Sequence, residues 1–229
     1  MKRYYPVYIL IVTIVLIQVL TLVTGKGFML TQLTMSAYYV LVGIGLCMVM
    51  GYAGQISLGQ AGFFAIGGYT TAFLTTIDFS DKAGTGLFKI LDTFSLLITK
   101  ETLYGDTIIH LSPWISLIAA VLIAGITAYA LGIPVLKLKG HYLAMATMGF
   151  GIIIYRIVLG TTIFGEADGI PNVPAFSIFP GLELSGDFTS RISNYYIAWA
   201  LVIAAVLLMV NLINSRVGRA LRSDRKSVV

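Results

Sequence analysis

Long apolar runs separated by polar segments dominate the chain, and their lengths fit helices that cross a membrane. A helix needs about 20 residues to cross a hydrocarbon layer about 30 Å thick. The runs cover residues 6–24, 28–50, 63–77, 114–133, 142–164 and 195–213. Arg156 is the only charged side chain within them. The pattern therefore predicts an all-α fold, a polytopic transmembrane helical bundle of about six spans.

Residues at the ends of these runs give local signals. Ser112 followed by Pro113 is typical of a helix start, where a capping side chain precedes a proline at the first helical position. Aromatic side chains near run ends are typical of the interface between membrane and water, and they include Trp114, Tyr142, Tyr195 and Tyr196.

The stretch between the second and third runs, residues 51–62, is the least regular part of the sequence. Its glycines, which disfavour a regular helix, are Gly51, Gly54, Gly59 and Gly62. Its polar side chains, which are costly at membrane depth, are Gln55, Ser57 and Gln60. Because the stretch carries no charge, it is not typical of an aqueous loop. The sequence predicts a glycine-broken helix after the second span.

Two interpretations of this break remain open. The first is tight packing, because a small-residue face that lets another helix approach closely follows it, formed by Ala61, Ala65, Gly68 and Ala72. The second is a solute path, because irregular backbone at membrane depth survives where protein buries it or where it lines a wet cavity. In the second interpretation the four glycines act as hinges. The predicted path residues are Gln55, Ser57, Gln60 and Tyr69.

The composition supports a membrane protein. Hydrophobic residues make up 58% of the 229 residues, charged residues 11%, and the mean hydropathy is +0.91. A soluble domain has about 25% charged residues, so a soluble enzyme and a disordered protein are both disfavoured. Cys47 is the only cysteine, which excludes a disulfide within the chain.

Charge is distributed unevenly along the chain. The net charge is +5, and basic residues concentrate before the first run, in the short segment 134–141 and in the tail after residue 213. Nine of the ten acidic residues lie in segments 78–112 and 165–194. The excess of basic residues on one side predicts a cytoplasmic N-terminus, with the lipid bilayer rather than nucleic acid as the partner of the basic segments.

No catalytic set of side chains is visible. His110 and His141 lie in loops expected on opposite faces of the membrane, and the sequence has no phosphate-binding loop. We therefore expect no enzymatic activity, no metal and no cofactor in this chain. The absence of a carboxylate within a span disfavours an ion-coupled secondary carrier, which stays the alternative class beside a membrane enzyme and a structural subunit. Arg156 either reaches the membrane surface or contacts the solute.

Four blocks of sequence resemble the branched-chain amino acid ABC-transporter permeases, in the branch that contains LivM. They are GYAGQISLGQAGFFAIGGYTTAFL at 51–74, GIPVLKLKGHYLAMATMGFG at 132–151, ADGIP at 167–171 and SRVGRALR at 215–222. Related permeases for urea or short amides share much of this pattern. Glu166 stands where the family usually has glycine.

The resemblance implies an importer subunit in a bacterial inner membrane that moves leucine, isoleucine or valine. Its implied partners are two ATP-binding subunits, a sister permease chain, and a periplasmic or lipid-anchored substrate-binding protein. ATP would be used by the partner subunits, so this chain would have a mechanical role.

The tail after the last run carries a second candidate site. Asn214 and Ser215 can cap a short helix on which Arg216, Arg219 and Arg222 share one face. This face is either a basic patch held by anionic lipid headgroups or, as the resemblance implies, a coupling helix docked on the ATPase through Arg216, Gly218, Arg219 and Arg222.

The resemblance ends near residue 222, which divides the chain into two predicted parts. Residues 1–222 form a transmembrane permease domain that we expect to be incomplete at its C-terminal end. Residues 223–229 form a non-native tail in this hypothesis, because the hexapeptide DRKSVV at 224–229 back-translates to a sequence like that of a sequencing adapter.

Overall fold

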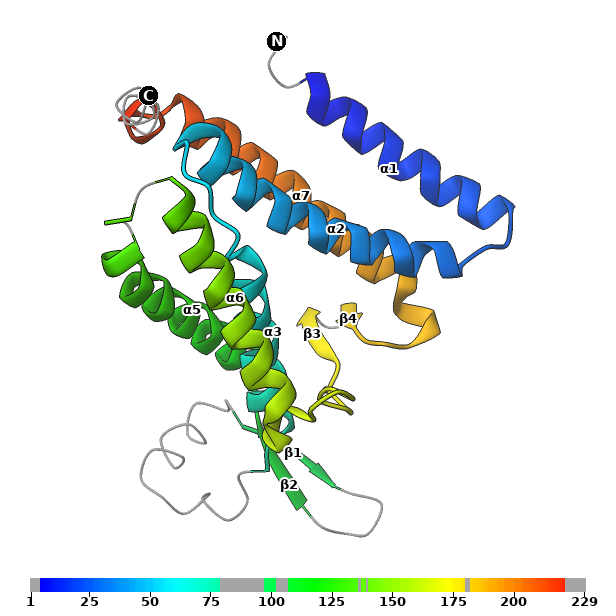
Figure 1. The fold of residues 1–229 in the computed structure, drawn as a ribbon. Helices are drawn as coiled ribbons and strands as arrows, with labels where there is room; N and C mark the ends of the chain where they lie inside the picture. Colours follow the sequence, from blue (N-terminus) through cyan, green and yellow to red (C-terminus); the bar gives the residue numbers. More distant parts are fainter. Residues whose placement is uncertain are drawn as a thin grey trace. The chain divides into compact units, whose positions relative to one another are not determined.

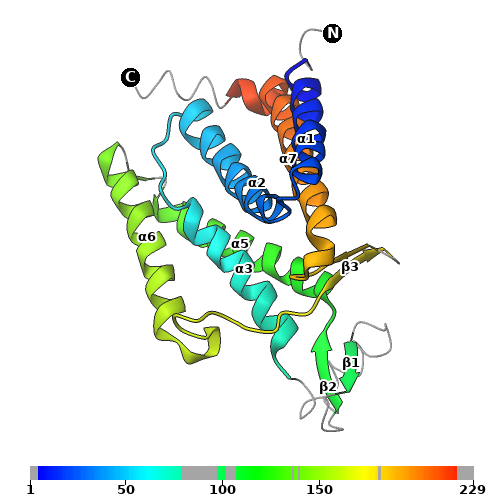
Figure 2. The same ribbon diagram turned by 90° about the vertical axis from the view of Figure 1, so that its right-hand side faces the viewer.

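The computed structural model describes residues 5–78, 97–101, 107–135, 137–138, 140–179 and 182–220. The chain forms two compact units, which Figures 1 and 2 show as ribbons. The first unit comprises residues 1–57 and 175–229, and the second comprises residues 58–174. The boundary between Ser57 and Leu58 falls inside the predicted glycine-rich break.

Helices make up most of the first unit. They are α1 (Tyr5–Val23), α2 (Phe28–Cys47) and α7 (Arg191–Asn214). The antiparallel strands β3 (Phe176–Phe179) and β4 (Leu182–Leu184) lead into a short 3₁₀ turn, Phe188–Ser190, before α7. The Arg191 guanidinium lies 4.2 Å from the centre of the Phe188 ring, a cation–π contact at the start of α7.

The core of the first unit lies between α2 and α7. Ala37 of α2 is fully buried together with Ala198 and Val202 of α7, and the two alanines allow the helices to approach closely. Tyr195 is also fully buried, and its hydroxyl donates a hydrogen bond of 3.0 Å to the carbonyl oxygen of Ile14 in α1. The Tyr195 ring therefore packs against neighbouring helices. Because α7 begins four residues earlier, at Arg191, Tyr195 is a core residue.

The second unit is built around α3. Its helices are α3 (Gln60–Thr76), α5 (Pro113–Val135) and α6 (His141–Gly160), followed by a 3₁₀ turn, Thr162–Phe164. Helix α3 packs against both α5 and α6. Pro113 is the first residue of α5, as predicted, and the carbonyl of Ser112 accepts hydrogen bonds from the amides of Ile115 and Ser116.

Two short hairpins were not predicted. Strands β1 (Leu97–Glu101) and β2 (Thr107–Leu111) pair in the first polar segment, and β3 pairs with β4 in the second. Both segments carry many charges, which concealed short runs of β-branched and aromatic residues. His110 of β2 contacts the carbonyl oxygen of Ile77 through Nδ1 at 3.1 Å, which ties this hairpin to the end of α3.

The predicted count of about six spans is wrong for the part of the chain that the structure describes. Four helices there are long and apolar enough to cross a membrane, and they lie within 28–52, 113–135, 141–160 and 188–214. The apolar part of α1 has 17 residues, as does α3. At about 1.5 Å per residue, 17 residues reach about 26 Å. Helix α3 is short because the break removes residues 53–59 from it.

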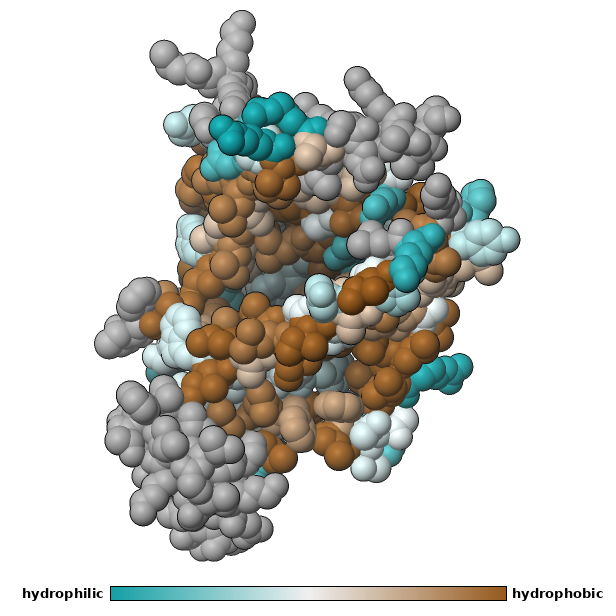
Figure 3. Space-filling view, turned by 90° about the vertical axis from the view of Figure 1, so that its left-hand side faces the viewer, coloured by the Kyte–Doolittle hydropathy of each residue, from teal (hydrophilic) through white to brown (hydrophobic). Residues whose placement is uncertain are grey.

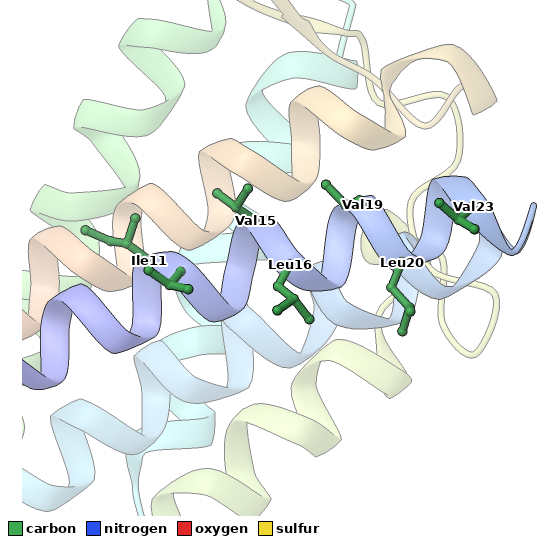
Figure 4. A pocket seen from close by; sticks show the side chains of 7 residues that line it. Ile11, Val15, Leu16, Val19, Leu20 and Val23 are labelled. Atoms are coloured by element: carbon green, nitrogen blue, oxygen red, sulfur yellow. The ribbon is translucent and has the colours of Figure 1, made fainter.

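The surface is apolar, as expected for helices in lipid. Brown, apolar side chains cover most of the described surface in Figure 3. Figure 4 shows one such face on α1, where valine, leucine and isoleucine side chains line a shallow hollow. All of its residues come from a single helix, so this hollow is an exposed helix face rather than an enclosed site. The all-α polytopic membrane fold is thus confirmed.

Candidate functional site

The predicted helix break is present, and its first half belongs to the first unit. Helix α2 passes directly into a π-helical turn, Met48–Tyr52, after which residues 53–59 are irregular. The amide of Ala53 bonds to the carbonyl of Met48 at 3.3 Å, and the amide of Gln55 bonds to that of Val49 at 3.2 Å. Gly54 has a φ of 71°, a conformation that is unfavourable for residues with a side chain. Gly54 therefore allows the chain to leave the helix here.

Polar side chains remain available in this half of the break. Gln55 and Ser57 are half-buried. Neither side chain forms a hydrogen bond with any residue that the structure describes. At membrane depth an amide without a protein partner needs water or a solute. Their chemistry fits the predicted path, and their assignment as path residues stays a prediction.

The second half of the break is fixed to α6. The amide of Leu58 donates a hydrogen bond of 3.0 Å to Oγ1 of Thr147. That hydroxyl in turn donates within α6 to the carbonyl of Leu143, at 3.0 Å. Thr147 thus satisfies an amide that the irregular backbone leaves without a helical partner.

Glycines of the break pack closely against the next turn of α6. A Cβ atom on Gly62 would lie 2.7 Å from the Phe150 ring, and one on Gly59 would lie 3.4 Å from it. The Phe150 ring also contacts the Phe63 ring in a tilted arrangement, with the ring centres 5.0 Å apart. Gly59 and Gly62 therefore make a close helix contact, which is the packing interpretation. The hinge role predicted for Gly51, Gly54, Gly59 and Gly62 is not tested by this geometry.

Thr147, Phe150 and Gly151 form a site that the sequence analysis missed. They share one face of α6, because their spacing is i, i+3 and i+4. A Cβ atom added to Gly151 would lie 3.9 Å from the carbonyl oxygen of Leu58. All three belong to the second block of the family resemblance. The signal available in the sequence was this spacing of a threonine, an aromatic residue and a glycine.

A cavity of about 180 Å³ lies between α3 and α6. Its lining includes Gly62, Ala65, Tyr69, Gly151, Tyr155 and Val158. A second, more open hollow of about 330 Å³ lies on α3 and is lined by Ala65, Gly68, Tyr69 and Ala72 among others. The small-residue face thus borders two hollows.

Of the predicted path residues on α3, only Tyr69 lines these hollows. Gln60 is half-buried at the first position of the helix. Tyr69 lies nine positions after Gln60, so at about 100° per residue the two lie on opposite faces of α3. Tyr69 packs edge-on against Phe164, with ring centres 5.8 Å apart. The structure therefore does not bring Gln60 and Tyr69 together.

The predicted coupling segment forms a sharp corner at the end of α7. Residues 216–220 are helical, and Oγ of Ser215 accepts a hydrogen bond of 3.3 Å from the amide of Gly218, as a cap should. Gly218 is buried against the carbonyl oxygens of Leu212 and Ile213, where a Cβ atom would clash. Arg219 donates to the Asn214 carbonyl at 3.3 Å.

The two described arginines of the tail therefore differ in their contacts. Both Arg216 and Arg219 are exposed, but Arg219 also holds the C-terminal end of α7. Arg222 and the predicted tail 223–229 lie outside the described residues.

Other candidate groups are simpler to place. Arg156 is exposed, four residues before the end of α6, and forms no ion pair with a described residue. This position fits a side chain that reaches the membrane surface. No group of three or more metal-binding side chains occurs among the residues that were described.

Comparisons with known proteins identify the family. A family model described as "Branched-chain amino acid transport system / permease component" matches residues 28–228. The chain is 35% identical over 153 residues to the "High-affinity branched-chain amino acid transport system permease protein LivM" of Salmonella typhimurium (strain LT2). It is 34% identical over 176 residues to the protein of the same name from Escherichia coli (strain K12). No solved structure matches the chain.

These matches cover most of this chain but only part of the relatives. They include 66% and 74% of the chain, and 28% and 34% of the Salmonella and Escherichia proteins respectively. The family model and the two relatives agree on one family. The chain belongs to the branched-chain amino acid transport permease components, a family of transport proteins rather than of enzymes.

Proposed function

We propose that this chain is a permease subunit of an ATP-binding-cassette importer for branched-chain amino acids in the bacterial inner membrane. The observation that carries the proposal is family membership combined with an uncharged helix break at residues 53–59. The relatives' names specify a high-affinity transport system for branched-chain amino acids. On this basis the transported solutes are leucine, isoleucine and valine.

The break supplies the polar groups of the solute path. Gln55 and Ser57 offer an amide and a hydroxyl that no described residue occupies. An amino acid carries an ammonium and a carboxylate, and side chains of this kind can accept from one and donate to the other. Because neither side chain is charged, a bound zwitterion is not held by a strong ion pair, which favours release.

Energy enters the transport cycle from other subunits. A periplasmic or lipid-anchored binding protein delivers the solute, a sister permease chain completes the path, and two ATP-binding subunits drive the change of access. The basic segments support a cytoplasmic N-terminus and tail, on the side where those ATP-binding subunits lie.

The corner at the end of α7 suits the transmission of force. The Ser215 cap, the buried Gly218 and the contact of Arg219 with Asn214 fix the short helix to α7. A displacement of this short helix is therefore passed to α7 rather than absorbed in a loose loop. Arg216 is exposed and free to contact an acidic surface of an ATP-binding subunit.

Uptake by the permease assembled with its partner subunits tests this function. Leucine uptake should require ATP, and uptake that persists after ATP depletion with a proton gradient maintained would instead indicate a secondary carrier.

Gln55→Leu should reduce uptake at an unchanged amount of protein in the membrane. Gln32→Leu, the same change at an exposed position of α2, is the matched control. Normal uptake by the Gln55 variant would remove this side chain from the path.

A further inference from the structure

We infer that the cavity between α3 and α6 receives the branched side chain of the transported amino acid. The inference deepens the proposed function and rests on it. It assigns a specificity site to residues of α6, none of which the sequence analysis placed in the solute path.

Size and walls fit an aliphatic group. The cavity of about 180 Å³ corresponds to about six water molecules at about 30 Å³ each. This volume accommodates the butyl side chain of leucine or isoleucine but not a large aromatic ring system together with its backbone. None of the described residues that line it is charged, and most are glycine, alanine, valine or leucine. Val158, which closes one side, is buried.

Two glycines line this space. Gly62 is on α3, and Gly151 is on α6. A Cβ atom on Gly151 would meet only the Leu58 carbonyl oxygen, at 3.9 Å, which is ordinary contact. A side chain at this position is therefore tolerated by the backbone and occupies cavity volume. The fold therefore does not require glycine at position 151. The absence of a side chain there leaves cavity volume open, as a binding site needs.

The cavity is preformed at the end that faces the helix break. The hydrogen bond from Leu58 to Thr147 and the contact of Gly62 with the Phe150 ring hold α3 and α6 at a fixed separation there. A cavity with fixed walls selects a ligand by its volume, because the walls cannot close around a smaller ligand without losing these contacts.

Two tyrosines complete the lining. They are Tyr69 and Tyr155, which lie on α3 and α6 respectively. A phenol can donate to a carboxylate or accept from an ammonium group. An apolar cavity with two phenols matches an amino acid with an aliphatic side chain better than it matches urea, which has no apolar part to bury.

Filling the cavity from Gly151 tests the inference. Gly151→Ala and Gly151→Val add volume in two steps, and replacing a helical glycine by alanine favours the helix. Gly149→Ala and Gly149→Val are matched controls, since Gly149 is on the same helix, has no neighbour within 4 Å of its Cβ position and does not line the cavity. The readout is the ratio of leucine to valine uptake by the assembled transporter, each supplied well below its half-saturating concentration, where the rate reflects how well each solute is accommodated.

We expect Gly151→Val to lower this ratio by about 10-fold, the effect of one excess methylene in a hydrophobic pocket. Gly151→Ala should give an intermediate ratio, and the Gly149 variants should keep the wild-type ratio. An unchanged ratio in Gly151→Val overturns the inference. An equal fall in the uptake of leucine and of valine also overturns it, because a lipid or another helix in the cavity would produce that result. If the unmodified transporter takes up neither solute, the proposed function itself is wrong.

Discussion

Replacing Thr147 by valine should release the second half of the helix break. The substitution keeps the shape of the side chain and removes the oxygen that accepts the Leu58 amide at 3.0 Å. Loss of one partner of a hydrogen bond costs about 1–3 kcal/mol when the other group is left unsatisfied. At about 1.4 kcal/mol per factor of ten, local opening should become about 5- to 150-fold more frequent.

Hydrogen exchange of the Leu58 amide measures this opening directly. Thr147→Val should accelerate exchange at this amide by the factor above, whereas Thr147→Ser retains the acceptor and should keep wild-type protection. Thr127→Val on α5 is the matched control. The Thr127 hydroxyl donates to the Ile123 carbonyl at 2.8 Å but accepts no amide from a distant segment. The control corrects for the loss of a hydroxyl inside a helix.

The size of the acceleration carries further information. Water that reaches the break can replace the lost acceptor, and the net cost is then near the low end of the range, about 1 kcal/mol. A dry break leaves the amide without a partner and gives the high end. Unchanged exchange at Leu58 in Thr147→Val would show that Thr147 does not hold the break, and the assignment of α6 as its anchor would have to be abandoned.

Three further predictions concern other segments. Arg216→Glu should weaken copurification of the ATP-binding subunit without changing the thermal unfolding midpoint. Arg219→Glu should weaken copurification and also lower the unfolding midpoint, because Arg219 holds the end of α7. Equal behaviour of the two variants would contradict the difference in their contacts. Gly54→Ala should destabilise the protein by about 1–2 kcal/mol because of its left-handed φ, and Gly51→Ala, at a position with open space, should not. In a variant without the native cysteine, Val173→Cys should react with a membrane-impermeant thiol reagent from outside only; labelling from the cytoplasm would reverse the proposed orientation.

Most of the helical architecture could be predicted from the sequence. Hydrophobic length alone located the apolar helices, and the glycines located the break, because both signals are local in the chain. The number of membrane-crossing helices could not be predicted in this way. Whether a run such as 63–77 forms a full span depends on where the preceding helix resumes, and the structure starts α3 at Gln60.

The anchoring of the break could not be predicted, because it joins residues far apart in the sequence. Leu58 and Thr147 are 89 positions apart, and their contact depends on how α3 and α6 are aligned. The same limit explains Gly218, which the family pattern assigned to docking. Its close approach to the carbonyls of Leu212 and Ile213 depends on the angle of a corner that no local pattern specifies.

The two halves of the break differ in a way that restricts where movement can occur. Before the unit boundary, the Gln55 amide still bonds back to the carbonyl of Val49 in the π-helical turn. After the boundary, the Leu58 amide is bound to α6. Between them, the amides of Ile56 and Ser57 form no hydrogen bond with a described residue. If transport moves the two units against each other, rotation at these residues breaks no hydrogen bond of their own amides to a described residue, and the predicted solute path and the hinge then share Ser57. If a residue of the hinge also lines the solute path, movement of the hinge changes the polar groups that face the solute. A single movement could then cause binding on one side of the membrane and release on the other.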